Sequence, residues 1–302
     1  MAADDMRDAT TPHDLPVDPA PGTFATSWRA AVQPASRPLD RMRGFARRSM
    51  LSALAAMHRG SADRFVRCLY CHYVFDDQRT DFERMIVRLK ALGTFVGTDH
   101  LLAMLAGERP VDGRYFHLSF DDGFRNNFTN ALPILRRHGV PAIFFVPSGL
   151  IGADWERTRT YCLDVTHYRS VIETLRWDDL KAMLDAGYEI GSHTRTHARF
   201  SAMSSDRTRL EDEILGSKQD LETGLGYRCR YISWPYGRTA DADTSSVGFT
   251  KTAGYDACFG AFRGSVVPGQ TDRYRIPRHH FEPQWRPAHV EYFARGNMEA
   301  AG

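Results

Sequence analysis

The sequence predicts an α/β fold, a closed or nearly closed (β/α) barrel, and two observations support this prediction. Short apolar segments rich in β-branched and aromatic residues recur along the chain from about residue 66. Amphipathic segments separate several of them, and strands that alternate with helices form right-handed βαβ units and a parallel sheet. The expected strands are residues 66–75, 115–120, 142–147, 188–191, 231–234, 257–260 and 273–277.

Four segments between these strands have the pattern of helices. Residues 81–89 place apolar side chains three and four positions apart and stop before Gly93, and residues 205–222 form a long, charged segment with one apolar face. Residues 126–138 and 178–186 are each followed by a glycine. Because functional groups of such folds collect at the carboxyl ends of the strands, we expect the chemistry of the protein there.

The composition excludes several classes of protein. The chain has 302 residues, of which 42% are hydrophobic and 25% are charged, as in soluble globular proteins. The 39 Lys and Arg residues against 37 Asp and Glu residues leave a net charge of +2, so we expect no nucleic-acid partner. The longest apolar stretches are far shorter than the ~20 residues of a membrane helix, so we expect no stable membrane insertion.

The first part of the chain has a different composition from the rest. Residues 1–38 hold six of the 15 prolines and too little apolar surface to form a core. We therefore predict a disordered tail over residues 1–38 and a linker with a short helix over residues 39–65. One folded domain is expected over residues 66–295.

Two features bear on the cellular compartment. Arg47 and Arg48, followed by an apolar run to Met57, are similar to a twin-arginine export signal, although no small-residue cleavage site follows. The five cysteines are an odd number, and the strand-like pattern around Cys68 and Cys71 favours two core thiols over half a zinc site or a redox pair. We therefore expect a cytoplasmic protein, with export as the alternative.

Two adjacent carboxylates follow the strand expected at 115–120. Asp121 and Asp122 precede Gly123 at the point where this strand ends. Neighbouring carboxylates are costly to bury unless a cation lies beside them. Adjacent residues at a strand end point in different directions, so one carboxylate can bind a metal ion while the other faces a bound water. A helix cap is the competing interpretation, since a helix is expected from residue 126.

Two histidines follow the strand expected at 188–191. His193 and His197 are four residues apart, which brings both to one metal ion if the segment makes a helical turn. Thr194 stands where the zincin motif H-E-x-x-H requires glutamate, so that class is disfavoured. One aspartate with two histidines forms a facial triad with open positions, which suits Zn²⁺ or another first-row divalent ion.

Three motifs, taken in order, resemble those of a known family. They are Phe120-Asp121-Asp122-Gly123, His193-Thr194-Arg195-Thr196-His197 and Trp234-Pro235-Tyr236-Gly237. They resemble the first three motifs of the polysaccharide deacetylases, the NodB-homology group or carbohydrate esterase family 4. The third motif is most similar to the subgroup with an aromatic-Pro-Tyr-Gly sequence, which includes deacetylases of exopolysaccharides and of the biofilm matrix. The likeness extends over roughly residues 66–285.

The resemblance implies a distorted (β/α)7 barrel and a metal-dependent hydrolase that removes acetyl groups from sugars. By position, Asp122, His193 and His197 correspond to the metal ligands, with Zn²⁺ expected and Co²⁺ or Ni²⁺ as alternatives. Asp121 corresponds to the general base that takes a proton from water. The backbone N–H of Tyr236 corresponds to a donor that stabilises the oxyanion.

The sequence departs from the commonest family pattern in two places. Many members carry an arginine just before the proline of the third motif, where this chain has Trp234. The last motif usually ends a strand with a histidine that acts as general acid, and the matching segment here ends at Arg278-His279-His280. We hypothesise that Arg278 replaces the missing arginine and that His279 or His280 protonates the leaving amine. An exposed basic turn is the alternative interpretation.

Three further residues are candidate substrate contacts. His72 lies in the first expected strand, where it can approach the site, support a ligand or belong to the core, and Trp234 belongs to the third motif. Asp76 lies in Phe75-Asp76-Asp77-Gln78, which repeats the first motif without its glycine. Asp76 or Asp77 can therefore contact sugar hydroxyls, or cap the helix expected at 81–89.

Aromatic side chains follow several of the expected strands, some of them in a long connection. The segment 150–176 is long for a connection inside a compact barrel, and such loops often bind ligands. Stacking on sugar rings and packing within the protein are both open interpretations. The side chains concerned are Trp155, Tyr161, Tyr168, Trp177 and Trp285.

The sequence therefore predicts a metal-dependent deacetylase whose partner is an N-acetylated saccharide, in a polysaccharide, a glycan or a lipid-linked precursor. A related C–N hydrolase acting on a small amide, cyclic imide or formamide is one alternative. A catalytically inactive glycan-binding relative is the other. Retention of Asp121, Asp122, His193 and His197 argues against inactivity, because decay usually starts with the base or a ligand.

Overall fold

The computed structural model describes residues 19–32, 49–50, 53, 63–241 and 243–295. The strands within these ranges pair in parallel. They are β1 (Phe65–Cys71), β2 (Thr94–Phe95), β3 (Arg114–Phe120), β4 (Ile143–Val146), β5 (Glu189–Ser192), β6 (Tyr231–Ser233), β7 (Ala257–Phe259) and β8 (His279–His280).

The strands curl into a distorted barrel. Their order in the sheet is β7-β6-β5-β4-β3-β1-β8, and β2 pairs with β3 beside this path. Residues 276–280 connect the two edges, since Ile276 pairs with Phe259 at the end of β7 while β8 pairs with β1. This topology confirms the predicted (β/α) barrel.

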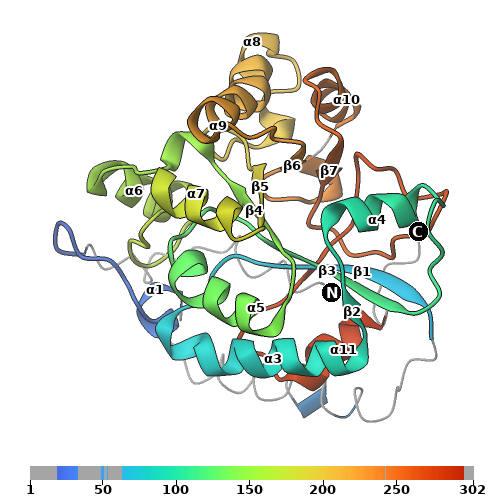
Figure 1. Ribbon diagram of the computed structural model, residues 1–302. Helices are drawn as coiled ribbons and strands as arrows, with labels where there is room; N and C mark the ends of the chain where they lie inside the picture. Colours follow the sequence, from blue (N-terminus) through green and yellow to red (C-terminus); the bar gives the residue numbers. More distant parts are fainter. Residues whose placement is uncertain (1–18, 33–48, 51–52, 54–62, 242, 296–302) are drawn as a thin grey trace.

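Helices surround the strands (Figure 1). Helices α3 and α11 lie side by side although they are far apart in the sequence. The α-helices are α1 (Trp28–Ala31), α3 (Arg79–Leu92), α4 (Thr98–Leu105), α5 (Leu132–His138), α6 (Trp155–Thr160), α7 (Trp177–Asp185), α8 (Arg207–Leu210), α9 (Ser217–Leu225), α10 (Thr244–Thr252) and α11 (Pro287–Ala294). Short 3-10 helices are η2 (Asp76–Gln78), η4 (Ser148–Leu150), η6 (Phe200–Ala202) and η8 (Thr239–Asp241), and short π-helical segments are η3 (Asn127–Ala131), η5 (Tyr161–Val165) and η7 (Glu211–Gly216). Among the helices described, none has both the length and the apolar character needed to span a membrane.

Helix α3 illustrates how the apolar spacing produces the packing. Its buried residues are Phe82, Met85, Ile86 and Leu89, which lie on one face. The helix ends before Gly93, where a Cβ would come within 2.4 Å of the carbonyl oxygen of residue 114. Only glycine allows the chain to pass so close to β3, so the predicted helix and its end are confirmed.

The last strand lies later in the chain than the sequence predicts. We expected residues 273–277, whereas β8 covers residues 279–280. The expected segment still contacts β7 through the bridge between Ile276 and Phe259, and Pro277, which has no N–H to donate, interrupts the pairing before β8. Strand β2, with two residues, is too short for its pattern to be recognised in the sequence.

Two apolar layers hold the barrel together. Alternate residues of a strand point to opposite faces, so β1 contributes to both layers. Val66 and Cys68 belong to an inner cluster with Phe145 of β4, whereas Leu69 packs with Phe82 of α3 in an outer cluster. The interior is therefore filled with side chains, and a substrate has access at an end of the barrel rather than through it.

Residues 19–32 pack against the domain, which differs from the disordered tail predicted over residues 1–38. Ala31 is fully buried, and Trp28 packs against the same cluster, which includes Tyr73 and Phe75. The sequence did not reveal this packing, because the few apolar side chains lie among residues whose composition is typical of a disordered tail. The other residues of the predicted tail, and most of the predicted linker at 39–65, lie outside the described residues.

Candidate metal centre

The carboxyl ends of β3, β5 and β6 bring the three sequence motifs to one end of the barrel. Asp121 and Asp122 follow β3, His193 follows β5, and Trp234 follows β6. Strand β5 pairs with β6 and with β4, and β4 pairs with β3. Because parallel strands end at the same edge, residues more than a hundred positions apart in the chain meet there.

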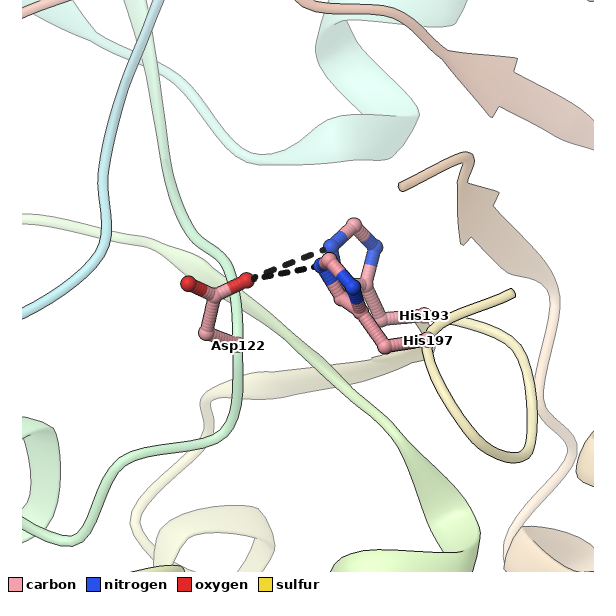
Figure 2. Close-up of side chains that lie close together, drawn as sticks. All are labelled: Asp122, His193 and His197. Atoms are coloured by element: carbon pink, nitrogen blue, oxygen red, sulfur yellow. Dashed lines mark ion pairs between the residues drawn. The ribbon is translucent and has the colours of Figure 1, made fainter. Parts of the chain in front are cut away.

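Asp122, His193 and His197 converge on one point, with the carboxylate facing both imidazoles (Figure 2). Oδ1 of Asp122 lies 3.5 Å from Nε2 of His193 and 3.3 Å from Nε2 of His197. One ligand atom from each residue lies within 4.8 Å of the others, and all three side chains are buried. Donors bonded at about 2.1 Å to a tetrahedral Zn²⁺ lie roughly 3.4 Å apart, so the spacing fits one ion.

The protonation states of the three side chains also fit a metal ion. Nδ1 of His193 lies 2.7 Å from the carbonyl oxygen of Ser233, which can only accept, so Nδ1 carries the proton and Nε2 offers a lone pair. Burial lowers the pKa of His197, against the opposing effect of Asp122. Burial also acts to raise the pKa of Asp122, but His72 and the two facing histidines outweigh it and hold that pKa well below its ordinary value. A carboxylate and neutral imidazoles are the forms that bind metals.

The backbone around the ligands is strained. Asp122, Thr194, His197 and Tyr236 have φ values of 70°, 64°, 66° and 63°. This left-handed region is unfavourable for residues with a Cβ, and such strain concentrates at functional sites. A helical turn, which the spacing of the two histidines suggested, is not what brings them together, because Thr194 and His197 leave the helical region.

Asp121 is held by a buried arginine. Nη1 and Nη2 of Arg278 lie 2.8 and 2.7 Å from the two carboxylate oxygens of Asp121. Burial raises the pKa of Asp121, but Arg278 and His193 outweigh it, so the pKa lies below its ordinary value. Arg278 has no exposed surface. Its remaining hydrogen bonds go to Ser119 Oγ, Ser233 Oγ and the carbonyl oxygen of Gly260.

The geometry therefore separates the roles of the two adjacent carboxylates. The oxygens of Asp121 face Arg278, whereas Oδ1 of Asp122 faces the histidines. The contact between Arg278 and Asp121 is the one expected of an arginine that replaces the missing residue of the third motif. The alternative of an exposed basic turn does not fit a guanidinium without exposed surface.

The two histidines that follow Arg278 point in different directions, because alternate strand residues face opposite sides. The ring of His280 lies 5.2 Å from those of Tyr70 and His72, on the side of Arg278, whose guanidinium lies 4.4 Å from the Tyr70 ring. His280 Nε2 lies 3.3 Å from a carboxylate oxygen of Glu282. Of the two histidines, His280 therefore lies with the residues of the site.

His279 lies on the other side of β8. Its ring nitrogen Nε2 is 3.1 Å from the carbonyl oxygen of Gly264, and the residue is 1% exposed. This contact anchors β8 to the preceding loop. The part of the sequence hypothesis that gave His279 an acid role is thus not supported by its orientation.

Tyr236 lies beside the metal ligands. Its ring is 5.1 Å from that of His197, and the guanidinium of Arg199 lies 3.8 Å from the centre of the Tyr236 ring. No described residue accepts a hydrogen bond from the Tyr236 backbone N–H. The next residue, Gly237, has φ 65°, and a Cβ there would lie 2.1 Å from that of Ala261. The turn after Tyr236 thus requires glycine at position 237.

Two of the candidate substrate contacts have other roles. Trp234 is 1% exposed and stacks on Phe262 with 6.1 Å between ring centres, so its side chain belongs to the core. Asp76 begins η2, and its carboxylate accepts a hydrogen bond of 3.0 Å from Asn130 Nδ2. The neighbouring Asp77 accepts one of 2.9 Å from the backbone N–H of Trp28. These carboxylates hold the chain in place, and neither repeats the role of Asp121 or Asp122.

Two tyrosines of the 150–176 connection belong to the site, where they contact Asp122 rather than stack on a sugar as the sequence analysis considered. Tyr168 donates a hydrogen bond of 3.2 Å to Oδ2 of Asp122, and Tyr161 donates one of 3.2 Å to the backbone carbonyl of Asp122. They are 3% and 2% exposed, so neither offers a face to a sugar ring. The length of the connection and its aromatic residues were the signals in the sequence, and they do not show which side chains face Asp122.

The fold and this set of residues define a class: a distorted (β/α) barrel that can hold a divalent metal ion at the carboxyl ends of its strands. A family model described as polysaccharide deacetylase matches residues 108–257. The chain is 30% identical over 169 residues to the chitooligosaccharide deacetylase of Sinorhizobium fredii, covering 51% of this chain and 67% of that protein. It therefore belongs to the polysaccharide deacetylase family, as the three motifs predicted.

The match to other relatives covers different shares of those proteins. The putative polysaccharide deacetylase YxkH of Bacillus subtilis is 24% identical over 135 residues, which is 45% of this chain and 41% of that protein. The structure of IcaB from Ammonifex degensii matches with a TM-score of 0.64 and 23% identity over 77% of this chain and 98% of that chain. Deacetylase PplD of Streptococcus pyogenes matches with a TM-score of 0.61 and 18% identity, over 76% and 98% of the two chains. These structures support the fold assignment, while the chain spans less than half the length of YxkH.

Proposed function

We propose that this protein is a metal-dependent deacetylase that hydrolyses the acetamido group of an N-acetylated sugar, in a polysaccharide, a glycan or a lipid-linked precursor. The observation that carries the proposal is the placement of the Asp121–Arg278 pair directly beside a set of one carboxylate and two imidazoles. Zn²⁺ is the proposed ion, because two imidazoles and a carboxylate leave a position open for water. Co²⁺ and Ni²⁺ suit the same donors.

Each step of the hydrolysis has a candidate residue. When bound, a divalent ion supplies Lewis-acid chemistry, which polarises a carbonyl and acidifies water. Asp121 takes the proton of the attacking water, and Arg278 keeps Asp121 ionised and oriented for that task. The Tyr236 N–H stabilises the oxyanion of the tetrahedral intermediate. His280 then protonates the leaving nitrogen, so the amine and acetate are released.

The proposal is tested by metal content and acetate release, measured on the same samples. We expect about one equivalent of zinc in the wild-type protein and acetate release from chitooligosaccharides or another N-acetylated glycan. Asp122→Ala and His197→Ala should lose both. Asp76→Ala is the matched control, because Asp76 follows a strand in a similar sequence but is held by Asn130.

Two results would argue against the proposal. A wild-type protein that neither contains nor takes up zinc, cobalt or nickel would exclude the hydrolase and favour a glycan-binding relative. Metal binding without acetate release from any N-acetylated sugar would instead favour hydrolysis of a small amide, cyclic imide or formamide.

A further inference from the structure

The segment 161–172 has a feature that the proposed mechanism does not use. Five non-glycine residues among those described have a left-handed backbone, and His167, with φ 57°, is one of them. The other four, at positions 122, 194, 197 and 236, all lie in the motifs of the metal centre. Strain at His167 directly precedes Tyr168, which suggests that the segment is shaped to place that side chain.

Tyr168 contacts the oxygen of Asp122 that does not face the histidines. Its hydroxyl donates to Oδ2 at 3.2 Å, whereas Oδ1 lies within 3.5 Å of Nε2 of both His193 and His197. Tyr161, from η5, donates to the backbone carbonyl of the same aspartate. Two phenols thus hold the side chain and the backbone of one residue.

We propose that Tyr168 is a positioning residue that directs a single oxygen of Asp122 towards the metal ion. The inference rests on the proposed metal centre. A hydrogen bond to one carboxylate oxygen favours ligation through the other oxygen alone, and single-oxygen ligation preserves open positions for water and substrate. Hydrogen-bond partners of metal ligands orient the ligands, and their removal typically weakens metal binding 10–100-fold.

Aromatic packing keeps the Tyr168 ring in place. It meets the Phe124 ring edge-on, with 5.3 Å between centres, and the Tyr73 ring at 5.9 Å. The buried ring cannot turn away from Asp122 without displacing these neighbours.

The N-terminal segment 19–32 holds the backbone that directly follows Tyr168. The N–H of Arg169 donates to the carbonyl of Ala31 at 2.9 Å, and the N–H of Ala25 donates to the carbonyl of Val171 at 2.8 Å. Asp77 in turn fixes the segment through the backbone N–H of Trp28. A part of the chain remote from the motifs therefore supports the orientation of a metal ligand.

The test measures binding of Zn²⁺ alone to the metal-free full-length protein, by competition with a chromophoric chelator. Tyr168→Phe removes the hydroxyl and keeps the ring, and we expect the dissociation constant to rise roughly 10–100-fold. Tyr231→Phe is the matched control, because its ring is buried and its hydroxyl donates to Oδ1 of Asp99 in α4 at 2.7 Å, and Asp99 also pairs with Arg230, which precedes β6, at the opposite end of the strands from the metal centre. This control should leave the dissociation constant unchanged.

Two further readouts separate positioning from general stability. The melting temperature of the metal-free Tyr168→Phe protein should match that of Tyr231→Phe, since each loses one hydrogen bond from a tyrosine hydroxyl to an aspartate. The absorption spectrum of bound Co²⁺ should change in Tyr168→Phe alone, because it reports the coordination of the ion.

The outcomes distinguish this inference from the proposed function. A Zn²⁺ dissociation constant for Tyr168→Phe within about threefold of wild type, with an unchanged Co²⁺ spectrum, would overturn the role of Tyr168. Absence of Zn²⁺ binding by the wild-type protein would overturn the proposed function itself. If Tyr168→Phe does not fold, Tyr161→Phe tests the same segment through its other contact with Asp122, and unchanged Zn²⁺ binding there would also contradict the inference.

Discussion

Replacement of Arg278 tests whether Asp121 is the general base. Arg278 forms two hydrogen bonds with Asp121 in a setting without exposed surface. Lysine keeps the charge but cannot form the two-pronged contact. We expect Arg278→Lys to lower kcat by about 100-fold or more while zinc content stays at the wild-type level. Turnover within about threefold of wild type would show that Asp121 needs no such partner, or is not the base.

His280 and His279 form a matched pair for the general acid, because they are adjacent in β8 and face opposite sides. His280 lies against Tyr70 and His72, whereas His279 contacts the Gly264 carbonyl. We expect His280→Ala to lower kcat by about 100-fold and His279→Ala to lower chiefly the thermal stability. Steady-state kinetics and melting curves of both variants check this. Equal kinetic losses, or a larger loss for His279→Ala, would reverse the assignment.

Single residues show what can and what cannot be predicted from the sequence. The motifs identify Asp122, His193 and His197 because ligand chemistry requires those residue types. Tyr168 carries no such signal, since its contact with Asp122 depends on how a long connection folds back. Trp234 was misjudged for a related reason: motif membership does not distinguish a core side chain from one that faces substrate.

At the scale of elements, helix α1 offers a direct test of whether residues 19–32 are packed or form a tail. Ala31 is buried, while Ala30, one position earlier, is exposed. We expect Ala31→Arg to lower the free energy of unfolding by about 1–3 kcal/mol, because a bulky charged side chain does not fit the cluster. Ala30→Arg should change it by less than about 0.5 kcal/mol. Urea denaturation measures both changes. Equal effects of the two substitutions would favour the original prediction of a disordered tail.

The elements that the sequence predicts well are those with local patterns. Helix α3 and its end at Gly93 follow from apolar spacing and one glycine, and β3 follows from a β-rich run before Asp121. β8 and α1 are different. Each has four residues or fewer, and each is stabilised by partners far away in the chain, so no local period reveals it.

For the molecule as a whole, the buried His117 makes stability depend on pH. It lies within the barrel, with Nε2 3.0 Å from Thr98 Oγ1, and burial together with Arg278 lowers its pKa from 6.5 to about 3. Between these values the unfolded chain binds a proton that the folded protein does not. Stability therefore falls as the pH drops from about 6.5 towards 3, by at most about 1.4 kcal/mol per pH unit for this group.

The replacement His117→Gln isolates this contribution. Glutamine does not titrate and can still pair with Thr98, so the variant should lose less stability than wild type between pH 7 and about pH 5. Urea denaturation at several pH values measures the two slopes. Parallel slopes would mean that His117 is protonated in the folded protein or does not titrate differently on unfolding.

The five buried cysteines can report which parts of the molecule open first. All are free thiols, and burial raises the pKa of Cys68, Cys162 and Cys229 to about 12. A closed, protonated thiol reacts with an alkylating reagent only when its surroundings open. Cys162 sits in the segment that carries Tyr168, whereas Cys68 sits in the barrel. The order in which they become labelled, read by mass spectrometry, would therefore show whether the metal-centre segment opens before the barrel does, with no introduced probe.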